Sequence, residues 1–122
     1  MLASEVPGGW ASARRHIYTA KASRREREAG TTDGCNHPTV KPIALTTYLA
    51  KLLLPPERDT PRRILTPFSG VGSEMIGALL AGWDEATGIE LDPEYARIAG
   101  ARIAHWIKPA IVDAPLFAQA AD

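Results

Sequence analysis

Apolar side chains recur at helical spacing in three stretches of the second half of the chain. The first set is Leu45, Tyr48, Leu49, Leu52 and Leu53, the second is Ile76, Leu79, Leu80 and Trp83, and the third is Tyr95, Ile98, Ala99, Ile103 and Trp106. A period of three to four residues is typical of helices with one apolar face. The pattern therefore predicts three helices.

Start and stop signals agree with these three helices. Pro42 suits the start of the first helix, and Pro55-Pro56 ends it because a proline ring cannot continue a helix. Gly82 is expected to cap the end of the second helix. Asp92 is expected to cap the start of the third, with Pro93 at its first position.

Short apolar segments between the helices predict strands. Ile64–Thr66 precedes the second helix, Thr87–Glu90 precedes the third, and His16–Ala20 is a further candidate. The order helix, strand, turn, helix, strand, helix is typical of a parallel, doubly wound α/β sheet. Two strands are too few for a stable sheet, so other strands must come from the N-terminal segment or be absent.

The composition is that of a globular protein, with 122 residues, 45% hydrophobic and 23% charged. No apolar run approaches the roughly 20 residues of a membrane span. The single cysteine, Cys35, excludes an internal disulfide and favours a reduced, cytoplasmic protein. Residues 10–63 carry 11 basic and 5 acidic side chains, whereas residues 64–122 carry 3 basic and 8 acidic. The first half of the chain is therefore the candidate surface for a polyanion, although a solvated surface with uneven charge is the simpler interpretation.

A glycine-containing turn, residues 68–73, lies between the first of the paired strands and its helix. Gly70 and Gly72 allow the backbone to approach a ligand, and Glu90 follows Gly70 by 20 residues, a spacing that suits a carboxylate binding ribose hydroxyls. Met75 stands where a dinucleotide fingerprint has its third glycine, and Glu74 would repel a pyrophosphate. The pattern favours a nucleoside without phosphates. An NAD-binding oxidoreductase remains an alternative, as does an ordinary tight turn.

A second candidate segment, residues 36–42, leads into the first helix. Its two prolines stiffen an extended backbone. His37, Thr39 and Lys41 place an imidazole, a hydroxyl and a cation close together, where they could bind a carboxylate. A helix-entry loop with an exposed lysine is the alternative.

Taken together, residues 21–106 resemble the C-terminal part of a β-class exocyclic-amino DNA methyltransferase, the adenine-N6 or cytosine-N4 enzymes of bacteria and phages found in restriction–modification. His37-Pro38-Thr39-Val40-Lys41-Pro42 is similar to the HPT-x-KP segment of the family, and residues 66–73 are similar to its DPF-x-GSGT motif. Residues 88–95 resemble its G-x-E-x-x-x-x-Y segment. The resemblance implies a partial Rossmann-like α/β fold that binds S-adenosylmethionine, with adenine favoured as the target base.

The resemblance also implies site residues. The cofactor-binding residues are His37, Thr39, Lys41, Thr66, Pro67, Phe68, Ser69, Gly70, Gly72, Ser73, Glu90 and Leu91. The candidate DNA contacts are Lys21, Arg24, Arg25 and Arg27, in the basic stretch before the KP segment. No catalytic residue and no metal ligand is assigned.

Three departures from the family pattern bear on activity. Thr66 stands where the family has Asp, and Ser73 where it has Thr. The Asp/Asn/Ser-Pro-Pro-Tyr/Phe motif, which holds the flipped base, is absent from the sequence. We therefore expect this chain to be the cofactor-binding part of such an enzyme and to be inactive alone. DNA would be bound by the full enzyme, and a partner chain is one possible source of the missing motif. A non-catalytic S-adenosylmethionine-binding module is the alternative.

The expected organisation has three parts. An irregular, basic N-terminal segment covers residues 1–35, the S-adenosylmethionine-binding α/β domain covers 36–108, and a C-terminal tail covers 109–122.

Overall fold

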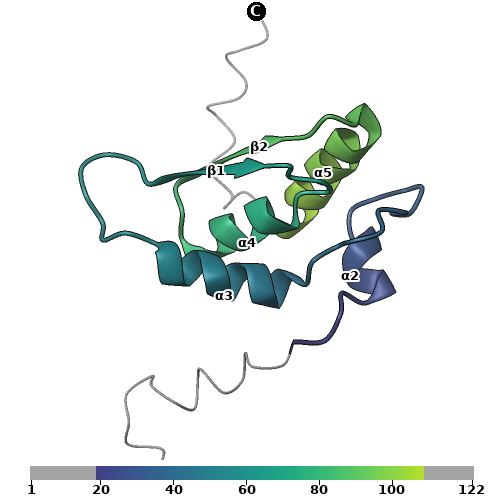
Figure 1. The fold of residues 1–122 in the computed structure, drawn as a ribbon, viewed down its shortest axis with the longest axis horizontal. Coiled ribbons are helices and arrows are strands. Elements are labelled where there is room, and N and C mark those ends of the chain that lie inside the picture. The colour runs from purple at the N-terminus through teal and green to yellow at the C-terminus, as the bar shows by residue number, and fades with distance from the viewer. Residues whose placement is uncertain (1–18, 109–122) are drawn as a thin grey trace, which may run out of the picture.

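The structure is a computed structural model that describes residues 19–108, and these form a small α/β unit (Figure 1). In chain order its elements are α2 (Arg24–Glu28), α3 (Ile43–Leu53), β1 (Arg63–Pro67), α4 (Ser73–Ala81), β2 (Glu85–Ile89) and α5 (Pro93–Trp106). The three predicted helices are confirmed as α3, α4 and α5. The predicted strands before α4 and α5 are confirmed as β1 and β2.

The two strands form a parallel sheet in which Arg63 pairs with Glu85 and Pro67 with Ile89. Figure 1 shows α4 under the strands, with α3 beside it. Side chains alternate between half-buried and exposed along both strands. Leu65 and Ile89 are exposed, because no element among residues 19–108 covers their side of the sheet.

The predicted caps explain where the helices begin and end. The Asp92 carboxylate accepts hydrogen bonds from the backbone N–H groups of Glu94 and Tyr95, and Pro93 is the first residue of α5. Gly82 ends α4 at a φ of 112°, which a residue with a side chain rarely adopts. These local signals therefore work as the sequence indicates.

Two expectations differ from the structure. The helical spacing predicts Leu80 on the apolar face of α4, but Leu80 is 46% exposed, whereas Ala78 and Ile76 are fully buried. The buried residues of α4 are Ser73, Ile76, Gly77 and Ala78, so small residues make up most of its buried side. Of the candidate strand at residues 16–20, the first three lie outside the described residues, and Thr19 and Ala20 belong to no strand.

The charged stretch after Lys21 forms a short helix, α2, that supports the segment leading into α3. Glu26 accepts a hydrogen bond from the backbone N–H of Ile43, the first residue of α3. Pro42, at the N-cap, has no side-chain acceptor to offer that helix. Arg27 donates to the backbone oxygen of His37 at 2.8 Å. The acidic and basic residues of α2 thus hold residues 37–43 in place.

Close packing of α3 against α4 depends on a glycine. A Cβ built on Gly77 would lie 2.3 Å from the Thr46 hydroxyl oxygen and 2.6 Å from the Thr46 carbonyl carbon. Thr46 is buried, and its hydroxyl donates to the backbone oxygen of Ser73 at 3.0 Å. The helices can approach this closely because position 77 has no side chain.

We expect Gly77→Ala to lower the free energy of unfolding by about 1–3 kcal/mol, since the added methyl group overlaps backbone that cannot move alone. Alanine favours the helix by about 1 kcal/mol over glycine, so the overlap must exceed that gain. Chemical denaturation measures the difference.

Gly100→Ala is the matched control for this substitution. Gly100 is an exposed residue within α5, and a Cβ there meets no atom within 4 Å. We expect this variant to be about 0.5–1 kcal/mol more stable than the parent. An increase in stability for both variants would contradict the close approach at Thr46.

No helix within residues 19–108 is both long enough and apolar enough to cross a membrane.

Candidate ligand-binding site

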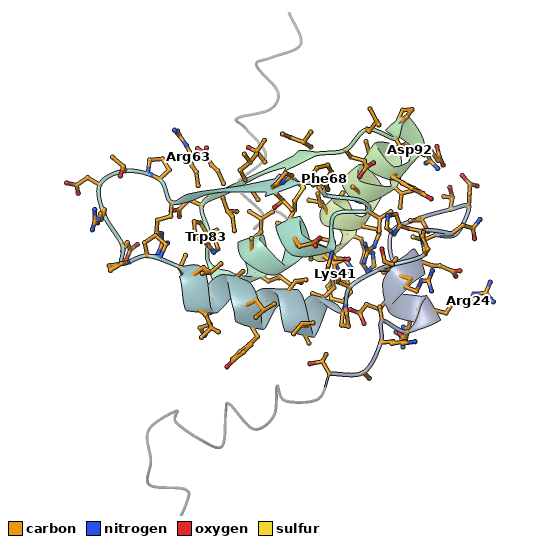
Figure 2. The ribbon with its side chains drawn as sticks, in the orientation of Figure 1. Arg24, Lys41, Arg63, Phe68, Trp83 and Asp92 are labelled. Atoms are coloured by element: carbon orange, nitrogen blue, oxygen red, sulfur yellow. The ribbon has the colours of Figure 1, made fainter. Side chains whose placement is uncertain are left out.

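A cavity of about 320 Å³ lies where the segment before α3, the turn after β1 and the residue after β2 meet. Its lining includes the predicted residues His37, Thr39, Lys41, Phe68, Ser69, Gly70, Ser73 and Glu90. Figure 2 labels Lys41 and Phe68, which come from two of these segments. Residues predicted from separate motifs therefore share one site.

Other predicted residues lie outside this lining: Thr66, Pro67, Gly72 and Leu91. Thr66 is half-buried within β1, where it pairs with Gly88 of β2. Gly72 is buried, and a Cβ built on it would lie 3.1 Å from the Cβ of Ala99. Two residues join the lining that the resemblance did not assign, Val71 and Glu74. The sequence signal for Glu74 was its charge in the first turn of the helix after the glycine turn.

The turn after β1 has an unusual backbone. Gly70 and Gly72 have φ values of 53° and 82°, and Phe68 adopts 58°, a left-handed value that is strained for a bulky residue. The N–H of Ser69 donates to Ile89 at 2.8 Å, which ties the turn to β2. The Phe68 side chain is 91% exposed at the cavity, so the strain places an aromatic ring there without burying it.

Glu90 connects the two loops at the end of the sheet. One carboxylate oxygen accepts the N–H of Gly70 at 2.7 Å, and the other accepts the N–H of Asp92 at 2.9 Å. A carboxylate has about four acceptor positions, so two remain. These backbone bonds fix the orientation of the carboxylate while leaving acceptor capacity for a ligand.

The His37 ring closes the cavity near the turn. A Cβ on Gly70 would lie 3.1 Å from His37 Nε2. The ring contacts Tyr95 edge-on with centroids 4.5 Å apart, and its Nδ1 accepts the N–H of Thr39 at 3.2 Å. The two predicted motifs thus touch at the position where glycine leaves room.

Lys41 forms an ion pair with Glu74, and both residues line the cavity. The two side chains are 54% and 30% exposed, respectively. Lys41 comes from the segment before α3, whereas Glu74 lies in the first turn of α4, where a negative charge is favourable. The segment around Lys41 predicts that this lysine binds a ligand carboxylate, but nothing in that segment indicates Glu74 as its partner.

A buried arginine supports the turn from below. Arg102 of α5 is fully buried, and its Nη1 donates to the Val71 oxygen at 2.7 Å and to the Ser73 hydroxyl at 3.1 Å. Burial lowers the pKa of this guanidinium from its usual range. Cys35, Val71 and Ile98 form the apolar cluster beside it.

The candidate DNA contacts are in different environments. Lys21, Arg24 and Arg25 are exposed, and Arg24 pairs with Glu28 at 3.0 Å. Arg27 is half-buried and donates to backbone oxygens, which gives it a structural role. Binding of DNA by the exposed residues stays a prediction.

Within residues 19–108, no three His, Cys, Asp or Glu side chains gather closely enough to hold a metal ion. Comparisons of the chain with protein-family models, with curated proteins and with solved structures gave no match.

Proposed function

We propose that this chain binds S-adenosylmethionine in the cavity described above, as the cofactor-binding part of a DNA methyltransferase with a partial Rossmann-like fold. The single observation that carries the proposal is the meeting of three motif segments in one cavity: His37 to Lys41, the glycine turn and Glu90. Each motif alone has an ordinary structural explanation. Their convergence supports a shared ligand.

The chemistry of the lining fits the parts of this cofactor. Glu90 has acceptor positions left for the ribose hydroxyls. Phe68 offers an exposed aromatic ring for the adenine base. Gly70 leaves open the space beside His37 that a side chain would fill. Lys41 supplies the cation for the carboxylate end.

The cofactor supplies an electrophilic methyl group on a sulfonium. The residues of this chain bind and orient it, whereas the target base amine must be held by other groups, because the Pro-Pro-Tyr motif is absent from the sequence. The proposed binding function does not depend on catalysis. It therefore applies equally to a non-catalytic module.

We expect S-adenosylhomocysteine to bind this chain more tightly than NAD, because the lining of the cavity contains no second cation for a pyrophosphate. Glu90→Ala should weaken S-adenosylhomocysteine binding about 10- to 100-fold, the loss expected for charge-assisted hydrogen bonds. Glu90→Gln should weaken it less, since one acceptor oxygen remains. Isothermal titration calorimetry measures the affinities of the parent chain for the two ligands and of both variants for S-adenosylhomocysteine.

The matched control is Glu85→Ala, which removes an exposed carboxylate of β2 that pairs with Arg63 outside the cavity. Because Glu90 also accepts two backbone N–H groups, thermal unfolding without ligand must show that the Glu90 variants stay folded. Unchanged affinity in a folded Glu90→Ala variant would overturn the assignment, and so would a preference for NAD.

A further inference from the structure

We propose that Lys41 and Glu74 act together as the recognition pair for a zwitterionic amino-acid group. Lys41 binds the carboxylate of that group, and Glu74 binds its ammonium. This inference rests on the function proposed above, because it concerns the amino-acid end of the same ligand.

The charges in the cavity point to this pair. The lining holds one lysine and two glutamates, and Lys41 and Glu74 lie in contact although 33 residues separate them in the chain. Both side chains are partly exposed at the cavity, so a ligand can reach them. A cation and an anion held side by side present the complement of a zwitterion.

The other glutamate is poorly suited to bind the ammonium. Both oxygens of Glu90 already accept backbone N–H groups, of Gly70 and Asp92, and the acceptor positions that remain are the ones proposed above for the ribose hydroxyls. Within residues 19–108, the carboxylate of Glu74 pairs with Lys41 and accepts no backbone N–H. Glu74 is therefore the carboxylate of the lining that is paired with a side chain, Lys41, which can move to admit a ligand.

The ion pair makes binding selective for a ligand with both charges. A zwitterion can insert so that each of its charges meets an opposite charge, and Lys41, with three donors, keeps partners throughout. A ligand with only a carboxylate must compete with Glu74 for Lys41. A ligand with only an ammonium must compete with Lys41 for Glu74. Removing the competitor should therefore strengthen the binding of a singly charged ligand.

Four adenosine thioethers separate these contributions in a binding titration. S-Adenosylhomocysteine carries both charges, and methylthioadenosine carries neither. Decarboxylated S-adenosylhomocysteine keeps the ammonium, and deaminated S-adenosylhomocysteine keeps the carboxylate. Each is titrated into the parent chain, Glu74→Gln and Lys41→Met.

We expect each substitution to weaken the binding of one singly charged ligand and to strengthen the binding of the other. Glu74→Gln should weaken S-adenosylhomocysteine and the ammonium-only ligand about five- to tenfold, as for partly exposed charges, and should tighten the carboxylate-only ligand. Lys41→Met should weaken the binding of S-adenosylhomocysteine and of the carboxylate-only ligand, and should tighten the binding of the ammonium-only ligand. Methylthioadenosine should bind all three proteins alike.

Matched controls remove similar charges away from the cavity. Glu94→Gln removes a first-turn carboxylate of α5 that pairs with Arg97, and Arg63→Met removes an exposed cation of β1. Both should leave all four affinities unchanged.

The possible failures are distinguishable. If Glu74→Gln changes all four affinities by the same factor, or none, the pair only supports the fold and this inference is wrong, while the proposed function stands. If the parent chain binds neither S-adenosylhomocysteine nor methylthioadenosine, both the proposed function and this inference are overturned.

Discussion

Arg102→Ala should lower the free energy of unfolding by about 3–5 kcal/mol, the largest stability effect we expect in the described part of the chain. The substitution empties the space of a fully buried long side chain. It also leaves the Val71 oxygen and the Ser73 hydroxyl without the donor that holds them. A small domain is stable by only about 5–15 kcal/mol, so urea denaturation should show an early midpoint.

Arg102→Met is the informative control, because it keeps most of the volume and removes the charge. Among residues 19–108, Nε and Nη2 of Arg102 have no hydrogen-bond partner, and burial lowers the pKa of the group. Removing such a buried charge offsets the lost hydrogen bonds. We therefore expect the free energy of unfolding of Arg102→Met to lie within about 2 kcal/mol of that of the parent. Equal destabilisation by Met and Ala would contradict this account and assign the loss to the hydrogen bonds.

Local chemistry made much of this fold predictable. Asp92 caps α5 through its own neighbours, Gly82 ends α4 with its own backbone, and Pro55 follows a helix it cannot continue. The convergence of Gly70 and Glu90 was predictable for a related reason. Both follow parallel neighbouring strands, whose carboxyl ends lie at one edge of a sheet.

Contacts between distant segments were not predictable in this way. Nothing within α5 marks Arg102 as buried, yet it is fully buried and donates to the Val71 oxygen and the Ser73 hydroxyl in the turn above it. Glu74 looked like an obstacle to an anion until the fold brought Lys41 beside it. In each case the side chain's role is set by a partner about 30 residues away. A sequence pattern read within one helix cannot identify that partner.

The size of the exposed apolar surface also depends on the tertiary arrangement. Leu65 and Ile89 belong to the short apolar segments that predict the strands, and a short apolar run would also suit a strand covered on both faces. In the described residues only one face is covered, and these side chains remain exposed. The apolar segments identified the strands but not the number of layers around them.

The second large effect concerns activity: these 122 residues alone should show no DNA methyl transfer above background. An in-line methyl transfer requires a base amine held against the sulfonium, and correct positioning can account for roughly 7–11 kcal/mol of the barrier. The sequence contains no Asp/Asn/Ser-Pro-Pro-Tyr/Phe motif, since its one Pro-Pro pair is flanked by Leu54 and Glu57. The lining of the cavity offers no aromatic group besides His37 and Phe68 to stack on a flipped base.

Transfer of tritiated methyl groups to mixed-sequence duplex and single-stranded DNA, at high protein concentration, tests this expectation. Weak, salt-sensitive DNA binding through Lys21, Arg24 and Arg25 is compatible with it, because phosphate attraction does not orient a base. Gly70→Asp is the control: at a φ of 53° and 3.1 Å from His37, the new side chain is strained and fills the cavity. Incorporation that rises with this chain and disappears in Gly70→Asp would contradict the prediction, because some group in these residues would then be orienting the target base.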